Sequence, residues 1–126
     1  MTLTPQFLTV GSIVEYNIGT LKEPEYISTT LDAVDLQSLE ADPEDFNYWH
    51  RPIELTPEIL TEWCGFERFE HTYHLNGFNI DLKFQYCMID GDGYCVYERY
   101  CEPIQYLHEL QLLFLGFKTV LPITIK

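Results

Sequence analysis

The clearest pattern in the chain is the run Phe78-Asn79-Ile80-Asp81-Leu82-Lys83-Phe84-Gln85-Tyr86-Cys87-Met88. Apolar residues occupy its even-numbered positions and mostly polar residues the odd ones, a period of two that is typical of a half-buried β-strand. We therefore predict one long strand from Phe78 to Ile89. Asn76-Gly77 before it is the preferred two-residue hairpin turn, because both residues tolerate a positive φ, and Asp90-Gly91-Asp92-Gly93 after it is a second turn.

These turns predict a three-stranded antiparallel meander with strands at about 69–75, 78–89 and 94–101. Leu75 should face Phe78 across the first turn, and Ile89 should face Tyr94 across the second. One face of the meander is then nearly all apolar. The meander therefore needs another element to cover that face.

A C-terminal helix that begins at Pro103 and ends at Gly116 is the predicted cover. Spaced at 100° per residue, one arc of this helix is apolar, and we expect that arc to pack on the meander. The arc consists of Tyr106, Leu107, Leu110, Leu113 and Phe114. Val120–Ile125 after it is predicted to be an edge strand.

A short helix is predicted before the meander, from about Pro57 to Cys64. Thr56 can cap its exposed backbone N–H groups, Pro57 suits the first helical position, and Gly65 suits the left-handed residue at its end.

The first 55 residues are predicted to form short strands in a bent N-terminal β-sheet or half barrel. The proposed strands are Val10–Tyr16, Glu25–Thr30 and a stretch around Val34–Leu39, and Asp42-Pro43-Glu44-Asp45 interrupts the pattern. The predicted fold is thus α+β in one domain, residues 1–126. Residues 1–55 supply the N-terminal strands, and residues 56–126 supply the short helix, the meander and the packed C-terminal helix.

Composition and charge exclude several classes of protein. The chain has 126 residues, 46% of them hydrophobic, and a formal net charge of −13, so it can build a core but is poorly suited to hold a phosphate backbone. Direct nucleic-acid binding and binding to anionic membranes are therefore not expected, and no apolar run is long enough to span a bilayer. The start of the chain lacks the features of a secretory signal, so we expect a cytoplasmic protein, in the host cytoplasm if a phage encodes it.

Metal and cofactor sites are not expected. The four cysteines contain no C-x-x-C pair and are interpreted as reduced thiols, and the four histidines show no zinc-ligand spacing. Asp90-Gly91-Asp92-Gly93 resembles the start of a calcium loop, but positions five and twelve would be Tyr94 and Cys101, so a plain turn is the better interpretation.

Catalytic motifs are also missing. The sequence has no nucleophile elbow, phosphate-binding glycine loop or H-E-x-x-H motif, so we do not expect an enzyme. His71 and Cys101 would flank Leu82 on one face of the meander, yet no carboxylate there could orient the imidazole, which favours a core histidine. A small enzyme that uses His71 or His74 with Glu70 remains the less favoured alternative.

The acidic residues are unevenly distributed. Thirteen of them fall between Glu23 and Glu70, against Arg51 and Arg68 alone. One interpretation is a solvated face that keeps a small protein in solution. The other is an anionic surface that docks on a basic partner and competes with nucleic acid for its positive groove. The residues predicted to bind the partner are Asp32, Asp35, Glu40, Asp42, Glu44, Asp45, Glu54, Glu58 and Glu62.

Several blocks carry a resemblance to a known group of proteins. They are Val10–Val14, Pro52–Leu60, Cys64–Phe66 and Ile104–Phe114, with the motifs Pro-Ile-x-Leu-Thr-x-Glu and Tyr-x-His-x-Leu-Gln-x-Leu-Phe. In these blocks the chain resembles small uncharacterised proteins of Bacteroidetes and of their phages and mobile elements. The chain departs from that group at Leu115–Lys118, where its members continue Ala-Leu-Thr-Gly-Glu.

The resemblance implies a genomic setting in which small acidic proteins often bind host machinery, including restriction and CRISPR nucleases. Together with the charge, it leads us to expect a non-enzymatic protein of phage or mobile-element type. This protein would inhibit a basic, nucleic-acid-handling host or defence protein, as anti-CRISPR and anti-restriction proteins do. The alternative is a phage structural or assembly module, in which spare apolar surface of the last helix would form a homo-oligomer interface.

Overall fold

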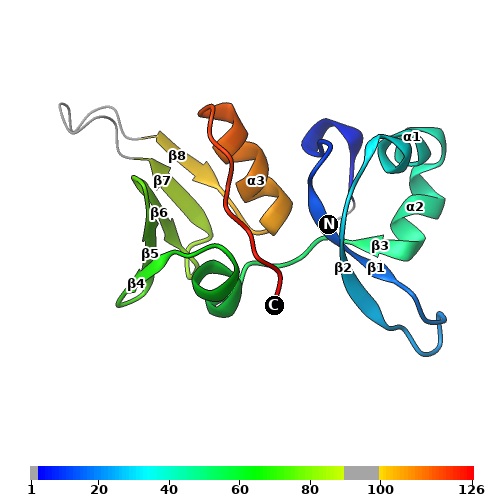
Figure 1. The fold of residues 1–126 in the computed structure, drawn as a ribbon, viewed down its shortest axis with the longest axis horizontal. Helices are drawn as coiled ribbons and strands as arrows, with labels where there is room; N and C mark the ends of the chain where they lie inside the picture. The colour runs from blue at the N-terminus through cyan, green and yellow to red at the C-terminus, as the bar shows by residue number, and fades with distance from the viewer. Residues whose placement is uncertain (1–2, 90–99) are drawn as a thin grey trace. The chain divides into compact units, whose positions relative to one another are not determined.

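The computed structural model describes residues 3–89 and 100–126 of the chain. Helices and antiparallel strands are both present, so the predicted α+β class is confirmed. The chain, drawn in Figure 1, divides into two compact units. Unit 1 contains Met1–Glu54 and Tyr106–Val120, and unit 2 contains Leu55–Gln105 and Leu121–Lys126. The division after Glu54 lies beside the boundary predicted at residue 55, but the C-terminal helix groups with the N-terminal residues.

Unit 1 contains a three-stranded antiparallel sheet. Its strands are β1 (Ile13–Asn17), β2 (Tyr26–Thr30) and β3 (His50–Arg51), in the order β2-β1-β3. Two of the predicted strands thus exist, although the first is shorter than expected. A short 3-10 turn, η1 (Pro5–Phe7), precedes the sheet.

The third predicted strand, Val34–Leu39, is wrong because these residues are helical. They belong to α1 (Ala33–Ala41), which is followed directly by α2 (Pro43–Trp49). Asp32 caps α1 by accepting a hydrogen bond from the Asp35 backbone N–H at 2.9 Å, while the Asp35 carboxylate accepts one from the Asp32 N–H at 2.9 Å. This reciprocal pair is a capping box, which starts a helix wherever the following residues tolerate one.

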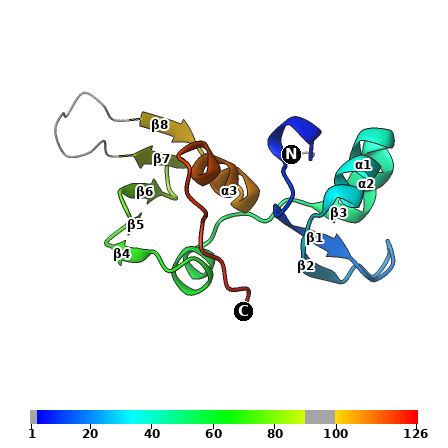
Figure 2. The same cartoon turned by 45° about the horizontal axis from the view of Figure 1, so that its top comes forward.

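The predicted interruption at Asp42-Pro43-Glu44-Asp45 is in fact the start of α2. Asp42 accepts a hydrogen bond from the Asp45 N–H at 3.1 Å, and Pro43 occupies the first helical position. The two helices lie beside each other next to the sheet in both views (Figures 1 and 2). Their buried side chains join residues of the sheet and of the N-terminal segment in one core. It contains Leu3, Leu8, Val14, Leu31, Leu39 and Phe46.

The C-terminal helix α3 (Leu107–Gly116) belongs to unit 1, where it contacts β1 and η1. It ends at Gly116 as predicted, and Leu107, Leu110 and Phe114 of the predicted apolar arc are buried. It begins four residues later than predicted, because Pro103 is the last residue of a strand.

Unit 2 contains a five-stranded antiparallel sheet in chain order, visible in Figure 2. The strands are β4 (Glu67–Phe69), β5 (Thr72–Leu75), β6 (Phe78–Asp81), β7 (Tyr86–Ile89) and β8 (Tyr100–Pro103). The predicted turn at Asn76-Gly77 is confirmed, with φ of 47° and 86° and Leu75 opposite Phe78. Ile89 pairs with Tyr100, and the expected partner Tyr94 lies outside the described residues, as does the turn at 90–93.

The long strand predicted from Phe78 to Ile89 is wrong, because it folds into the β6–β7 hairpin. The Asp81 carboxylate accepts a hydrogen bond from the Phe84 N–H at 3.1 Å, and Gln85 takes a left-handed φ of 54°. A side chain that binds the backbone three residues later provides an alternative to an extended ladder. Ile80 and Cys87 remain buried on either side of the turn, while Phe84 is 66% exposed.

The short helix before the sheet follows the prediction closely. Helical residues begin at Pro57, and the turn widens to a π-helix, η2 (Ile59–Trp63). Thr56 accepts a hydrogen bond from the Ile59 N–H at 3.2 Å, and Gly65 takes the left-handed φ of 79°. The predicted strand Val120–Ile125 is absent: these described residues form no ladder, although the Thr124 N–H binds the Trp63 carbonyl at 2.8 Å.

His108 on α3 is fully buried, and neither ring nitrogen has a hydrogen-bond partner among the described residues. Burial lowers its pKa, an effect that the Glu109 carboxylate partly opposes. Because the pKa is lower in the folded chain, the unfolded chain binds more protons at this site just below about pH 6.5, so the free energy of unfolding falls as the pH falls.

We therefore expect His108→Phe to flatten the pH dependence of stability on the acid side of about pH 6.5, the usual pKa of histidine, by at most about 1.4 kcal/mol per pH unit. Urea unfolding of both proteins at a series of pH values measures this, since contributions from other groups cancel in the difference. His71→Gln is the control for removal of an imidazole at an exposed position. Parallel curves for the parent and His108→Phe would contradict the expectation.

Candidate functional site

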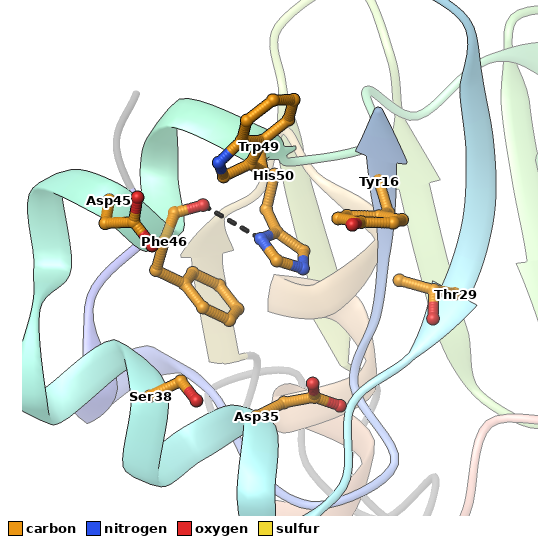
Figure 3. A pocket seen from close by; sticks show the side chains of 8 residues that line it. All are labelled: Tyr16, Thr29, Asp35, Ser38, Asp45, Phe46, Trp49 and His50. Carbon is orange, nitrogen blue, oxygen red and sulfur yellow. Dashed lines mark hydrogen bonds between the residues drawn. The ribbon is translucent and has the colours of Figure 1, made fainter. Parts of the chain in front are cut away.

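A pocket of about 370 Å³ opens between the sheet and the two helices of unit 1 (Figure 3). It is lined by Tyr16, Thr29, Asp35, Ser38, Asp45, Phe46, Trp49 and His50. These residues come from β1, β2, α1, α2 and β3, so five short elements contribute to one site. The volume is at the lower end of the range for small-ligand pockets, about 300–1,000 Å³.

The sheet forms one wall of the pocket. Tyr16 and His50 occupy paired positions on β1 and β3, and their ring centroids are 4.9 Å apart with the planes inclined at 37°. Thr29 of β2 pairs with Val14, two residues before Tyr16, and side chains alternate between the faces of a strand, so all three lining residues share one face.

His50 is held in one orientation by Phe46. Its Nδ1 lies 2.8 Å from the Phe46 carbonyl oxygen, and the two rings stack with centroids 3.8 Å apart and planes at 5°. Because a carbonyl oxygen can only accept, Nδ1 carries the proton in this contact. In the neutral ring Nε2 is then a hydrogen-bond acceptor, and Figure 3 shows this nitrogen directed into the pocket.

The helices form the opposite wall and carry its charge. Asp35 and Ser38 come from α1, and Asp45, Phe46 and Trp49 come from α2. One oxygen of the half-buried Asp35 accepts the capping bond from Asp32. Asp45 is exposed. Two acidic residues, Asp35 and Asp45, therefore line this pocket, and no lysine or arginine is among its lining residues.

The structure gathers six of the nine predicted partner-binding residues on α1, α2 and the residues that cap them. These six are Asp32, Asp35, Glu40, Asp42, Glu44 and Asp45. Glu54 is exposed at the end of the N-terminal part of unit 1 and forms an isolated bridge with Tyr106. Glu58 and Glu62 are exposed residues of the helical turn that contains η2, in unit 2.

Three of the six carboxylates also stabilise helix ends. Asp32, Asp35 and Asp42 accept backbone N–H bonds, and the bond from Asp35 lowers the pKa of the Asp32 carboxyl. In the described part of the chain none of the six forms an ion pair; the salt bridge found there joins Arg51 to Glu15 at 3.2 Å. Among the described residues, therefore, no cation neutralises their charge through an ion pair.

The residues of the alternative enzyme hypothesis lie in or beside the β4–β5 hairpin of unit 2. Glu70 and His71 are exposed in the turn between β4 and β5, and His74 Nε2 lies 2.8 Å from the Thr72 hydroxyl. Leu82, which was to separate His71 from Cys101 on one sheet face, lies in the β6–β7 turn instead. The side chain of Cys101 lies outside the described residues.

Cysteine and metal chemistry gain no support from the described residues. Cys64 and Cys87 are buried, and burial raises the pKa of Cys64 to about 12, which leaves its thiol protonated and unreactive at neutral pH. Cys95 lies outside the described residues. Within the described ranges, no three His, Cys, Asp or Glu side chains gather as metal ligands.

Comparison of the chain with protein-family models, with curated proteins and with solved structures finds no match. The resemblance to small phage and mobile-element proteins therefore stays a prediction. None of the helices in the described ranges combines the length and apolarity that crossing a bilayer requires.

Sequence reasoning missed the pocket, including Tyr16, Thr29, Trp49 and His50. Trp49-His50 is an aromatic pair beside the acidic segment, which is a weak signal of a binding surface. The sequence analysis did not predict that α1 and α2 form between residues 33 and 49. These helices bring Asp35 and Asp45 to the pocket wall opposite β1.

Proposed function

We propose that the protein is a non-enzymatic binding protein that docks the acidic surface of α1 and α2 on a basic, nucleic-acid-handling partner. The acidic surface is defined as Asp32, Asp35, Glu40, Asp42, Glu44 and Asp45. The observation that carries the proposal is the density of charge: fourteen consecutive residues hold six carboxylates and no lysine or arginine.

The exposure of these carboxylates supports the proposal. Five of the six are exposed, and the sixth, Asp35, faces the pocket. Charges of one sign on one surface raise the local potential and speed the encounter with an oppositely charged partner. A nuclease groove that normally holds a phosphate backbone is a surface of the required sign. Occupation of that groove would inhibit cleavage, as an anti-CRISPR or anti-restriction protein does.

The cap residues allow the charge to be tested without loss of the helices. Asparagine caps helices about as well as aspartate, so Asp42→Asn removes a charge and keeps the cap. The test variant is Glu40→Gln, Asp42→Asn and Glu44→Gln, none of which lines the pocket. The matched control is Glu23→Gln, Glu67→Gln and Glu70→Gln, three exposed carboxylates elsewhere.

The probes are a guide-loaded CRISPR effector nuclease and a restriction endonuclease, with binding measured by biolayer interferometry and inhibition by DNA cleavage. For a nuclease that the protein inhibits, we expect the test variant to bind at least about tenfold more weakly and the control to change by less than about threefold. Affinity of the parent should fall steeply as salt rises from about 50 to about 500 mM. Equal effects of the two variants, affinity indifferent to salt, or no binding to either nuclease at low salt would reject the proposal.

A further inference from the structure

We infer that the pocket between β1, β3 and the two helices receives an organic cation, a guanidinium or ammonium group on a short aliphatic chain. Within the proposed function, on which this assignment rests, the cation is an arginine or lysine side chain of the partner. The inference stands on the lining of the pocket, its size, and an arrangement of the chain's own residues on the other face of the sheet.

The charged side chains that line the pocket are both acidic, whereas its hydroxyl and indole groups are neutral. Ionised Asp35 and Asp45 are acceptors only, and His50 presents the acceptor Nε2 because its Nδ1–H is engaged by Phe46. A guanidinium has five donors and no acceptor, and an ammonium has three donors and no acceptor. A phosphate or carboxylate ligand would meet two negative charges here. The chemistry of the wall therefore selects a cation.

The aromatic rings provide the second element of cation recognition. Tyr16 and Trp49 line the same pocket as the two carboxylates. A cation over the face of an aromatic ring is attracted by the ring quadrupole, most strongly for tryptophan. A carboxylate and an aromatic ring together satisfy both the charge and the apolar stem of a lysine or arginine side chain.

The same chemistry already binds an arginine on the opposite face of this sheet. Arg51 places its guanidinium 3.5 Å from the centroid of the Tyr26 ring and forms an ion pair with Glu15 at 3.2 Å. Glu15 precedes Tyr16, and Arg51 follows His50, so alternation along the strands puts these two pairs on opposite faces. The pocket face also carries acidic and aromatic residues, but none of its lining residues is a lysine or arginine. The cation must therefore come from a ligand.

The size of the pocket limits the ligand to one such group. About 370 Å³ accommodates a single side chain or a small molecule and is too small for a helix or a folded loop. A partner would therefore insert one anchor residue here, while the remaining carboxylates of the acidic surface contact the surrounding positive charge. Interfaces commonly concentrate their binding energy in an anchor of this type.

The probe for this inference is N-acetyl-arginine methylamide, with the corresponding lysine and citrulline compounds beside it. Citrulline has nearly the shape of arginine without the charge. Binding is followed by Trp49 fluorescence in a Trp63→Phe background, which leaves one tryptophan, and by calorimetry. We expect the arginine or lysine compound to bind and the citrulline compound to bind at least about tenfold more weakly.

Two double variants identify the site. Asp35→Asn with Asp45→Asn removes both carboxylates of the pocket, and asparagine at 35 can still accept the capping bond from Asp32. Asp32→Asn with Asp42→Asn removes the same charge from the neighbouring cap positions, which do not line the pocket. We expect the first variant to weaken binding of the arginine compound at least about tenfold and the second by less than about threefold.

Binding of citrulline as tight as that of arginine, equal effects of the two double variants, or no binding at tens of millimolar would overturn the cation site. The proposed function is judged separately, through Glu40, Asp42 and Glu44 outside the pocket. One further outcome is that the arginine compound binds to the pocket while the Asp35 and Asp45 replacements leave the affinity for the nuclease unchanged. That combination would overturn the assignment to a partner's side chain and would identify a free amine as the ligand.

Discussion

Replacement of Phe46 by alanine is expected to lower the free energy of unfolding by about 3–5 kcal/mol. Phe46 is 4% exposed and packs in the core of unit 1. Truncation removes the apolar contacts of a whole ring and leaves a cavity that the short helix α2 cannot easily fill by collapse. The free energy is measured by urea denaturation followed by circular dichroism.

Phe46→Leu is the matched control for this prediction. It retains most of the buried volume and should cost under about 1.5 kcal/mol, because volume-conserving apolar substitutions are tolerated. It also removes the ring that stacks on His50 at 3.8 Å, although the backbone carbonyl that binds Nδ1 is retained. If Phe46→Ala were within 1 kcal/mol of the parent, the described packing of α2 in the core would be contradicted.

Some parts of the fold were predicted correctly because the backbone preferences of one or two residues determine a turn or a helix start. The Asn76-Gly77 turn and the Thr56-Pro57 helix start were predicted from backbone chemistry alone, and the structure confirms both. The same chemistry was present in Asp42-Pro43, which has an N-cap residue followed by proline. That signal was interpreted as an interruption between strands, which hid the helix α2.

The error in the long strand has a different origin. Alternation of apolar and polar residues is equally compatible with one strand and with two strands joined by an even-numbered turn. The choice between them depends on the Asp81 carboxylate, which binds the Phe84 N–H, and on Gln85, which accepts a left-handed φ. Neither residue belongs to the glycine-containing pairs that mark hairpin turns most strongly, so the pattern alone favoured one strand.

The candidate site was predictable only in part. Its acidic residues lie close together in the sequence, but the pocket is formed by residues that are far apart in the sequence. Six of the predicted acidic residues lie on two adjacent helices or at their N-caps. The pocket, by contrast, joins β1 to residues about thirty positions later in the chain. Its pairing of Tyr16 with His50 depends on the register of β1 with β3, a two-residue strand with no periodicity of its own.

The acidic surface serves the fold and the proposed function together. Asp32 and Asp42 begin the two helices that carry the charge, and Asp35 both completes a cap and faces the pocket. An amide at each of these positions could make the capping bond. A carboxylate at each of these positions adds its charge to the acidic surface and also interacts favourably with the positive end of the helix dipole.

The integrity of unit 1 also depends on Gln111, which connects α3 to the beginning of β1 across the sequence of unit 2. Its Oε1 accepts the Ile13 N–H at 2.7 Å, and its Nε2 donates to the Gly11 carbonyl at 2.9 Å. The Gln111 side-chain amide thereby provides a hydrogen-bond partner for the Ile13 N–H and for the Gly11 carbonyl. Loss of a partner costs about 1–3 kcal/mol for each buried backbone group that stays unsatisfied.

We therefore expect Gln111→Ala to lower the free energy of unfolding by about 2–4 kcal/mol, measured by urea denaturation. Gln37→Ala, at an exposed position of α1, is the matched control and should change it by less than about 0.5 kcal/mol. Hydrogen exchange locates the effect, since the Ile13 amide should lose protection in the Gln111 variant and keep it in the control. Unchanged protection of Ile13 would mean that the N-terminal strands keep their structure without the hydrogen bonds from α3. The segment Tyr106–Val120 would then contribute little to the stability of unit 1.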